Sequence, residues 1–370
     1  MKSTHSVQSL FQPFTAGNMT LANRIVMAPM TRSFSPGGVP GPDVADYYRR
    51  RAESGVGLIV TEGTVINHPA ASSDANVPRF HGEDALSGWS NVAAAVHEAG
   101  GRIIPQLWHV GTQRPAGALP NPEALPVGPS GLTGSGEKVN EPMTEKEIEA
   151  VIDAYAQAAA DAKRLGFDGI ELHGAHSYLI DQFFWEKTNR RTDGYGGDIV
   201  ERTRFAVEVI EACRRAVGLD FPIVLRYSQW KIGDFTAKLA ETPDLLAKFL
   251  APLTDAGVDV FHCSTRRFWE PEFEGSDLNL AGWTKKLTGK PTITVGSVGL
   301  DADFTSLFTE GKGAANAGLD GLIDRLERNE FDLVAVGRAL LADPAWADKI
   351  RGGRMDELVP FTAEAVKTLV

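Results

Sequence analysis

Two histidines and a tyrosine lie close together in the segment His173-Gly174-Ala175-His176-Ser177-Tyr178, which directly follows an apolar run. Side chains alternate along a strand, so Glu171 and His173 share one face and Ile170 and Leu172 share the other. The aliphatic pair is expected to face outward. His173 is therefore expected to point inward, where a ligand can reach it.

His176 is an odd number of residues from His173, so it can share that site only if the chain turns at Gly174-Ala175. Paired imidazoles serve as metal ligands, as acid and base, or as hydrogen-bond donors to an oxygen. Zinc needs further ligands at suitable spacing, and the sequence offers no clear candidates. Donors to a substrate oxygen are favoured over metal ligands and over core histidines. Tyr178 could supply a proton, although a lone tyrosine is more often structural.

Glycine-rich turns follow two later strands, as Gly296-Ser297-Val298-Gly299 and Gly337-Arg338. Strands seven and eight of a barrel often bind phosphate through backbone N–H groups, and an arginine adds a bidentate contact. The sequence therefore predicts a phosphate site here, with ordinary glycine turns as the alternative.

Other polar groups also stand at strand ends, namely Gln106, Arg226 and the run Pro29-Met30-Thr31. Arg226 has the parity of Val224 on its strand, so it is expected to point inward. Taken singly, each of these signals is weak.

Eight short aliphatic segments must position these groups. They are Arg24–Pro29, Gly57–Glu62, Ile103–Leu107, Asp168–His173, Pro222–Tyr227, Val258–Cys263, Thr292–Gly296 and Asp332–Gly337. Helical periodicity between them is clearest in Asp43–Ser54, Gly88–Ala99, Glu145–Leu165, Ile199–Val217 and Pro243–Ala256. Repeated strand-then-helix units predict a single (β/α)₈ TIM barrel over residues 1–370. A doubly wound sheet is disfavoured because no G-x-G-x-x-G follows the first strand.

Two long segments exceed a minimal barrel, Thr112–Pro142 after strand three and Gln229–Thr242 after strand five. Both leave the face where barrel enzymes keep their active sites, so binding loops are favoured over surface decoration. Leu319–Arg328 is predicted to be an added helix before strand eight, after the flexible-looking Lys312–Gly318.

Composition narrows the class of protein. A formal net charge of −11 argues against nucleic acid and anionic membranes as partners. Cys213 and Cys263 are the only cysteines, too few for a disulfide framework or an iron–sulfur cluster. With no apolar run of transmembrane length, a cytoplasmic protein acting on a small molecule is expected, as a monomer or homodimer.

Several motifs in collinear order resemble the old yellow enzyme family. They are Ala22-Asn23-Arg24-Ile25-Val26-Met27-Ala28-Pro29-Met30-Thr31-Arg32, Tyr47-Tyr48-Arg49-Arg50-Arg51-Ala52, Gln106-Leu107-Trp108-His109, His173-Gly174-Ala175-His176-Ser177-Tyr178-Leu179, Tyr195-Gly196-Gly197 with Glu201-Arg202-Thr203-Arg204-Phe205, and Val336-Gly337-Arg338. The resemblance covers nearly the whole chain.

The resemblance implies a non-covalent FMN on the barrel's C-terminal face. It assigns the isoalloxazine and its polar edge to Pro29, Met30, Thr31, Gly63, Gln106 and Arg226, and the phosphate to Gly296, Ser297, Gly299, Gly337 and Arg338.

The resemblance also implies an ene-reductase with a ping-pong mechanism. NADPH or NADH reduces the FMN, and an α,β-unsaturated carbonyl compound or nitroalkene is then reduced in the same pocket. His173 and His176 bind the substrate oxygen, and Tyr178 donates the proton. Trp108 and Trp269 are expected to border the substrate.

Departures from the family pattern leave two alternatives open. Trp230 and Trp269 stand in atypical segments and would suit a cation held by cation–π contacts, as in oxidative demethylation of an N-methylated compound. A non-catalytic flavin-binding protein is the other alternative. Thr31 replaces the redox-tuning cysteine of one branch, and Ser177 replaces a more usual glycine.

Overall fold

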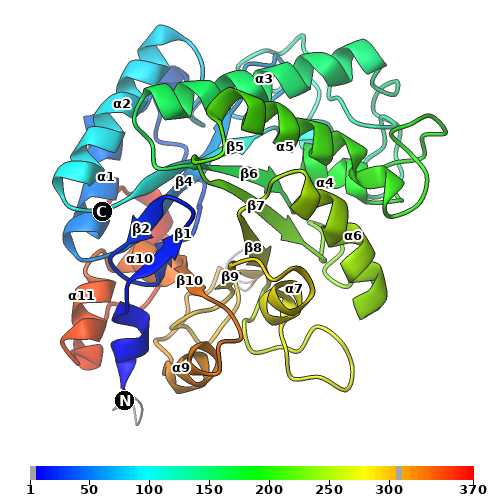
Figure 1. Ribbon diagram of the computed structural model, residues 1–370. Coiled ribbons are helices and arrows are strands. Elements are labelled where there is room, and N and C mark those ends of the chain that lie inside the picture. Colours follow the sequence, from blue (N-terminus) through cyan, green and yellow to red (C-terminus); the bar gives the residue numbers. More distant parts are fainter. Residues whose placement is uncertain (1–5, 306–310) are drawn as a thin grey trace.

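Eight parallel strands close into a barrel in the order β10-β3-β4-β5-β6-β7-β8-β9. A computed structural model describes residues 6–305 and 311–370 of the chain (Figure 1). The barrel strands are β3 (Ile25–Met27), β4 (Leu58–Val65), β5 (Ile103–Trp108), β6 (Ile170–Gly174), β7 (Ile223–Ser228), β8 (Val260–Ser264), β9 (Thr292–Val295) and β10 (Leu333–Val336). Each falls on one of the predicted segments, so the predicted TIM barrel is confirmed.

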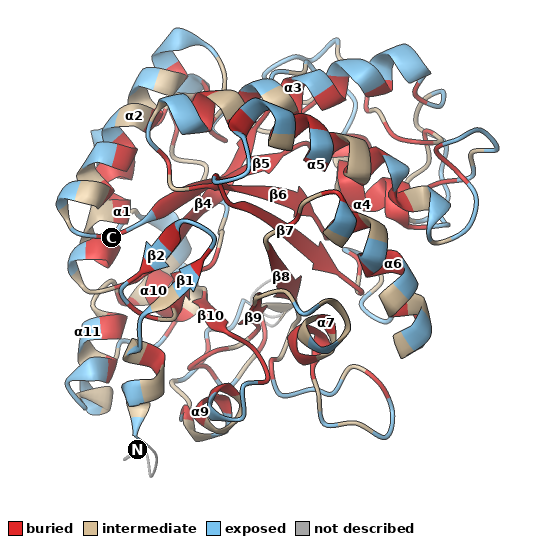
Figure 2. Ribbon diagram, viewed as in Figure 1, coloured by how far each residue is buried: buried red, intermediate tan, exposed pale blue. Residues whose placement is uncertain are grey.

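The strands are buried on both faces, as their near-continuous apolar sequences require. Alternate residues fill the barrel interior, where Val26, Ile104, Val224 and Leu333 belong to one apolar cluster. Their neighbours along the strands point outward and pack against the helices (Figure 2). Leu172 lies in this outer cluster, so the predicted parity of β6 is correct.

A short hairpin that the sequence analysis did not anticipate closes the N-terminal end of the barrel. Strands β1 (Phe14–Ala16) and β2 (Met19–Leu21) pair antiparallel around a turn at Gly17 and Asn18. Ala16, Met19 and Leu21 pack into the interior cluster. A Gly-Asn pair between short apolar runs is a hairpin signal, but three-residue strands carry too little periodicity to reveal it.

Helices surround the barrel with their buried sides toward it and their exposed sides outward (Figure 2). They are α1 (Pro42–Glu53), α2 (Glu83–Glu98), α3 (Glu145–Arg164), α4 (Leu179–Phe184), α5 (Arg204–Val217), α6 (Pro243–Asp255), α7 (Leu280–Thr288), α9 (Asp320–Glu327), α10 (Arg338–Ala342) and α11 (Trp346–Arg351). Short 3₁₀ turns are η1 (Val7–Phe11), η2 (Pro36–Gly38), η3 (Gly111–Gln113), η4 (Glu201–Thr203), η5 (Met355–Glu357) and η6 (Ala363–Lys367).

The predicted helices are present, with shifted ends. Helix α2 begins at Glu83, earlier than the predicted Gly88, and the segment predicted from Ile199 begins instead as η4 before α5. Helix α3 opens with a capping box in which the Thr144 side chain accepts from the Glu147 N–H and Glu147 bonds back to Thr144.

The two long loops leave the C-terminal ends of β5 and β7, and α9 is the added helix before β10. Residues 229–242 contain neither helix nor strand. In the described parts of the chain, each helix is too short or too polar to cross a membrane.

Candidate active site

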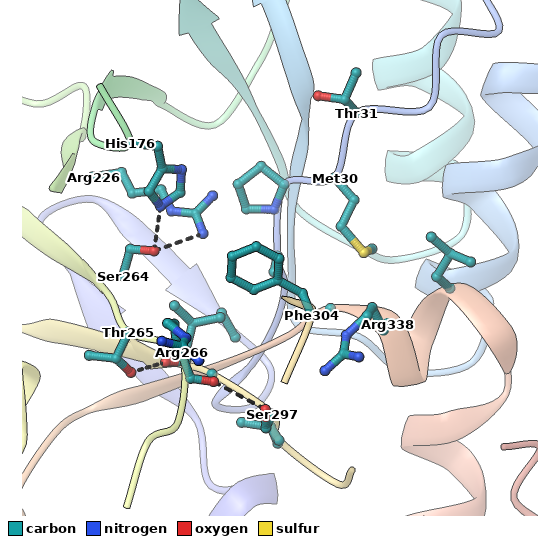
Figure 3. Close-up of a pocket in the computed structure, with 18 of the residues that line it drawn as sticks. Met30, Thr31, His176, Arg226, Ser264, Thr265, Arg266, Ser297, Phe304 and Arg338 are labelled. Carbon is teal, nitrogen blue, oxygen red and sulfur yellow. Dashed lines mark hydrogen bonds between the residues drawn. The ribbon is translucent and has the colours of Figure 1, made fainter. Parts of the chain in front are cut away.

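A cavity of about 400 Å³ opens at the C-terminal ends of the barrel strands. This size is within the usual range for small-molecule and cofactor sites. Figure 3 shows His176, Arg226 and Ser264 grouped on one side of the cavity and Arg338 across from them. The predicted residues that line it are Pro29, Met30, Thr31, Gln106, Trp108, His173, His176, Tyr178, Arg226, Gly296, Ser297, Gly337 and Arg338.

Three predicted site residues lie elsewhere. Gly63 lies on β4 behind Trp108, where an added Cβ would meet the indole at 2.5 Å. Gly299 stands beside Trp346 with a φ of +72°. Trp269, in the loop after β8, is 40% exposed, packs on Phe268 and does not line the cavity, so its position gives no support to substrate contact.

Left-handed backbone at two residues brings His176 into the site. His176 has a φ of 62° and Ser177 a φ of 63°, so the turn expected at Gly174-Ala175 is made two residues later. Such a conformation is costly without a Gly, and surrounding bonds must hold it. The Ser177 N–H donates to Asp181 Oδ2 at 2.7 Å, and the His176 N–H donates to Ser228 Oγ at 3.1 Å.

The aromatic groups of the predicted site form one cluster. The ring centroids of His173 and His176 are 5.1 Å apart, and Tyr178 lies 4.9 Å from His173 in an edge-to-face arrangement. Trp108 contacts Tyr178 edge to face at 4.8 Å. The expected convergence of two imidazoles and a phenol is therefore present in the structure.

Electrostatics keep all three groups in their neutral forms. Burial and then the Arg226 cation lower the pKa of His173 and of His176 well below the ordinary histidine value. Burial raises the pKa of Tyr178 to about 12, opposed by Arg226. At neutral pH the site thus offers imidazole N–H donors and a protonated phenol.

A buried chain of polar side chains crosses the barrel beneath the cavity. Gln106 Nε2 donates to Glu171 Oε1 at 2.8 Å, and Glu171 Oε2 bonds His262 Nδ1 at 2.7 Å. This bond uses one of the two N–H donors of the amide, so Gln106 can offer a ligand its second N–H and its amide oxygen. Glu171 and His262 were not selected from the sequence, although their inward parity was a usable signal.

Arg226 brings a positive charge to the same place. Its side chain is buried, as predicted from its parity, and Nη2 donates to Ser264 Oγ at 3.4 Å. Nε is buried without a partner among residues 6–305 and 311–370. A buried cation with a spare donor favours an electron-rich ligand in the cavity.

The opposite side of the cavity carries the glycine-rich turns. Gly296 has a φ of +134°, and an added Cβ would meet the backbone of Arg266 and Thr265 at 2.8 Å. The Arg338 guanidinium donates to the carbonyl of Asp303 at 3.1 Å and to that of Ala302. Gly296, Ser297, Gly337 and Arg338 thus line the same cavity.

The segment after β3 is tied to two parts of the molecule. Glu62 Oε2 accepts the N–H of Arg32 at 2.8 Å and that of Ser33 at 3.1 Å. Arg32 Nη2 donates to the carbonyls of Ala365, Val366 and Thr368, and Val366 lines the cavity. These bonds fix the backbone that carries Met30 and Thr31.

The cavity suits a flavin mononucleotide in chemistry as well as place. It combines a buried cation with an unpartnered donor at one side and a glycine-lined cradle with an arginine at the other. Within the described chain, no group of three or more His, Cys, Asp and Glu could hold a metal ion.

Comparison with known proteins identifies the family. The model of the NADH:flavin oxidoreductase / NADH oxidase family matches residues 9–315. The chain belongs to this family of FMN-binding NAD(P)H oxidoreductases, which includes the old yellow enzymes, so the resemblance and the cofactor inferred from the sequence are confirmed.

Similar proteins differ in length from this chain. An NADH oxidase of Thermoanaerobacter brockii is 37% identical over 95% of this chain, but the chain spans only 52% of that relative. Chanoclavine-I aldehyde reductase fgaOx3 of Penicillium roqueforti is 34% identical, with 95% of this chain and 90% of that protein covered. A structure of morphinone reductase with tetrahydroNAD superimposes with a TM-score of 0.77 at 30% identity, covering 93% of this chain and 90% of that one.

Proposed function

We propose that this protein uses NADPH or NADH to reduce activated carbon–carbon double bonds, such as those of α,β-unsaturated carbonyl compounds and nitroalkenes. Relatives similar over most of both chains are named as reductases, among them a putative 12-oxophytodienoate reductase 2 of Oryza sativa at 33% identity. The observation that carries the proposal is the cluster of two neutral imidazoles and a protonated phenol beside buried Arg226.

The bound FMN would supply hydride transfer, which side chains cannot perform. Pro29, Met30 and Thr31 would line the ring system, with Gln106 and Arg226 at its polar edge. Gly63 supports this arrangement indirectly by leaving room for Trp108. The phosphate would be held by Gly296, Ser297, Gly299, Gly337 and Arg338.

His173 and His176 would donate hydrogen bonds to the substrate's carbonyl or nitro oxygen. These bonds draw electron density from the double bond and make its β-carbon electrophilic. Negative charge grows on that oxygen in the transition state, where fixed donors typically contribute a few kcal/mol. Tyr178 would protonate the α-carbon, and its high pKa keeps that proton available at neutral pH.

Oxidative demethylation is the weaker alternative. A caged cation needs free aromatic faces, but Trp230 stacks on His176 with centroids 4.4 Å apart. Trp269 does not line the cavity, so one wall of the proposed cage is missing.

We further propose that residues 1–370 form one barrel domain in a cytoplasmic protein, acting on small molecules as a monomer or homodimer without binding nucleic acid or membrane. The strands and helices of the barrel, from β3 to α11, account for most of the described chain, which supports a single domain. Cys213 and Cys263 are both free and buried, in keeping with a reducing compartment.

The test is an anaerobic absorption titration of the purified protein with NADPH, followed by 2-cyclohexenone. The proposal expects a flavin spectrum that bleaches with NADPH and returns with the enone. A flavin that bleaches and is not reoxidised would refute the assigned acceptor. The double variant His173→Ala/His176→Ala is the matched control: it should retain flavin and slow only the enone step.

A further inference from the structure

We propose that Ser264 is a positioning residue that fixes the proton of His176 on Nδ1, so that this nitrogen supplies the hydrogen bond to the substrate oxygen. The proposal rests on the proposed function for the identity of the substrate. The tautomer itself follows from contacts around the ring.

Ser264 ends strand β8 and meets two polar side chains of the site. Its hydroxyl lies 2.7 Å from His176 Nε2 and accepts from Arg226 Nη2 at 3.4 Å (Figure 3). The side chain is buried and also lines the cavity. In the barrel register Ser264 pairs with Ser228, which holds the backbone of His176.

The direction of the hydrogen bond between Ser264 and His176 follows from the number of donors and acceptors available. A guanidinium can only donate, so the Ser264 oxygen accepts from Arg226. The serine has one hydrogen, and among the described residues His176 Nε2 is the other hydrogen-bond partner of this hydroxyl. If Nε2 donated instead, the buried serine hydrogen would be left without an acceptor among the described residues, which is unfavourable. Ser264 therefore donates to Nε2.

The remaining proton of the neutral ring must then be on Nδ1. Burial and the nearby Arg226 keep His176 uncharged. In the described chain Nδ1 bonds to no residue, and the ring lines the cavity. The Nδ1–H is thus the donor that His176 offers to a ligand.

His173 carries the opposite tautomer. The Ala175 N–H donates to His173 Nδ1 at 3.4 Å, which leaves the proton on Nε2. The site therefore presents one Nε2–H and one Nδ1–H to the same oxygen. Without Ser264, His176 would be free to move its proton to Nε2 and withdraw its donor from the cavity.

The indole of Trp230 holds the ring in this orientation. It stacks on His176 at an interplanar angle of 24°, and its Nε1 donates to the Ser264 carbonyl at 3.1 Å. Ser264 thus sets the proton through its side chain and anchors the stacking partner through its backbone. Only the side-chain effect is lost in Ser264→Ala.

The experiment is ¹⁵N NMR of histidine-labelled, FMN-loaded protein, with the His176 signals assigned by comparison with His176→Gln. The wild type should show a protonated Nδ1 and an unprotonated Nε2. Ser264→Ala should lose this preference, and Ser264→Thr, which keeps the hydroxyl, should restore it. Ser135→Ala is the control, since Ser135 is an exposed serine that bonds the Thr133 hydroxyl and has no bond to His176, and it should leave the tautomer unchanged.

Enone kinetics complete the test. Loss of one hydrogen bond to the oxygen predicts that Ser264→Ala weakens kcat/KM for 2-cyclohexenone about tenfold, with recovery in Ser264→Thr. A protonated Nε2 in the wild type, or an unchanged tautomer in Ser264→Ala, would overturn the proposal. A confirmed tautomer without enone turnover would instead count against the proposed function, so the two failures are distinguishable.

Discussion

Lys231 and Asp181 form an ion pair with 2.6 Å between Nζ and Oδ1, and both side chains are fully buried. Lys231 belongs to the loop after β7, and Asp181 lies on α4. The second oxygen of Asp181 accepts the N–H of Ser177 in the left-handed turn that carries His176. The pair therefore links an atypical loop to the conformation of the proposed active site.

Removing the lysine should destabilise the protein strongly. Lys231→Met leaves Asp181 as an unpaired buried carboxylate, which typically costs about 3–5 kcal/mol. Urea unfolding at neutral pH measures this loss. Lys187→Met is the matched control, because Lys187 pairs with Asp234 at the surface and should change stability by about 1 kcal/mol or less. Equal effects of the two variants would contradict the role given to Lys231.

Tyr178→Phe should separate the two halves of the catalytic cycle. The phenol is the proposed proton donor, so reoxidation by the enone should slow by about 10²–10⁴-fold, the usual contribution of a general acid. Reduction by NADPH needs no proton from this group and should change little. Anaerobic stopped-flow absorption measures each half-reaction, and equal slowing of both would remove Tyr178 from this role.

Arg226→Gln should lower the flavin's reduction potential. The buried cation, whose Nε has no hydrogen-bond partner among the described residues, favours the electron-rich reduced flavin. A loss of about 1.4 kcal/mol corresponds to about 30 mV for a two-electron couple. Spectroelectrochemical titration checks this. Arg102→Gln, an exposed surface variant, is the control, and an unchanged potential together with unchanged FMN affinity in Arg226→Gln would contradict the placement.

Glu62 should make folding stability depend on pH. Burial raises its pKa to about 7, opposed by bonds from the N–H groups of Arg32 and Ser33. Since the folded state holds this proton more tightly than the unfolded state, stability is highest below about pH 4.5 and falls as the pH rises through about 7. Glu62→Gln lacks this titration.

The measurement is the unfolding free energy of both proteins between about pH 5 and pH 8. The wild type should lose roughly 2–3 kcal/mol relative to Glu62→Gln across this range, from the size of the shift. Parallel curves, or a wild type that gains relative stability at high pH, would show that the pKa of Glu62 is not raised.

The barrel could be predicted because its strands are buried runs of aliphatic residues, and such runs can be recognised in the local sequence alone. Inward parity likewise placed His173 and Arg226 correctly. The position of His176 was harder to predict, because its turn depends on Ser228, 52 residues along the chain, as well as on the nearby Asp181. The direction of Trp269 could not be predicted, because in an irregular loop it follows from packing, here against Phe268.

The polar supports of the site were missed for a related reason. Ser264 and His262 have the inward parity of Val260 on β8, yet serine and histidine are common in barrels and carry no motif. Their role depends on the register between β8 and β7, which pairs His262 with Arg226 and Ser264 with Ser228. The supporting bonds join residues up to 91 positions apart, beyond the reach of local pattern analysis.

The hairpin of β1 and β2 affects how ligands enter and leave the cavity. Among the described residues, the apolar side chains of the hairpin and the packed barrel interior fill the N-terminal end of the barrel. The cavity is therefore open only at the C-terminal ends of the strands. Under the proposed function, the oxidised nicotinamide must leave through this opening before the enone can enter, and the reduced product must leave before NADPH can bind again. Excess enone should therefore slow the reduction of the flavin by NADPH, and excess NADPH should slow the reoxidation of the flavin by the enone.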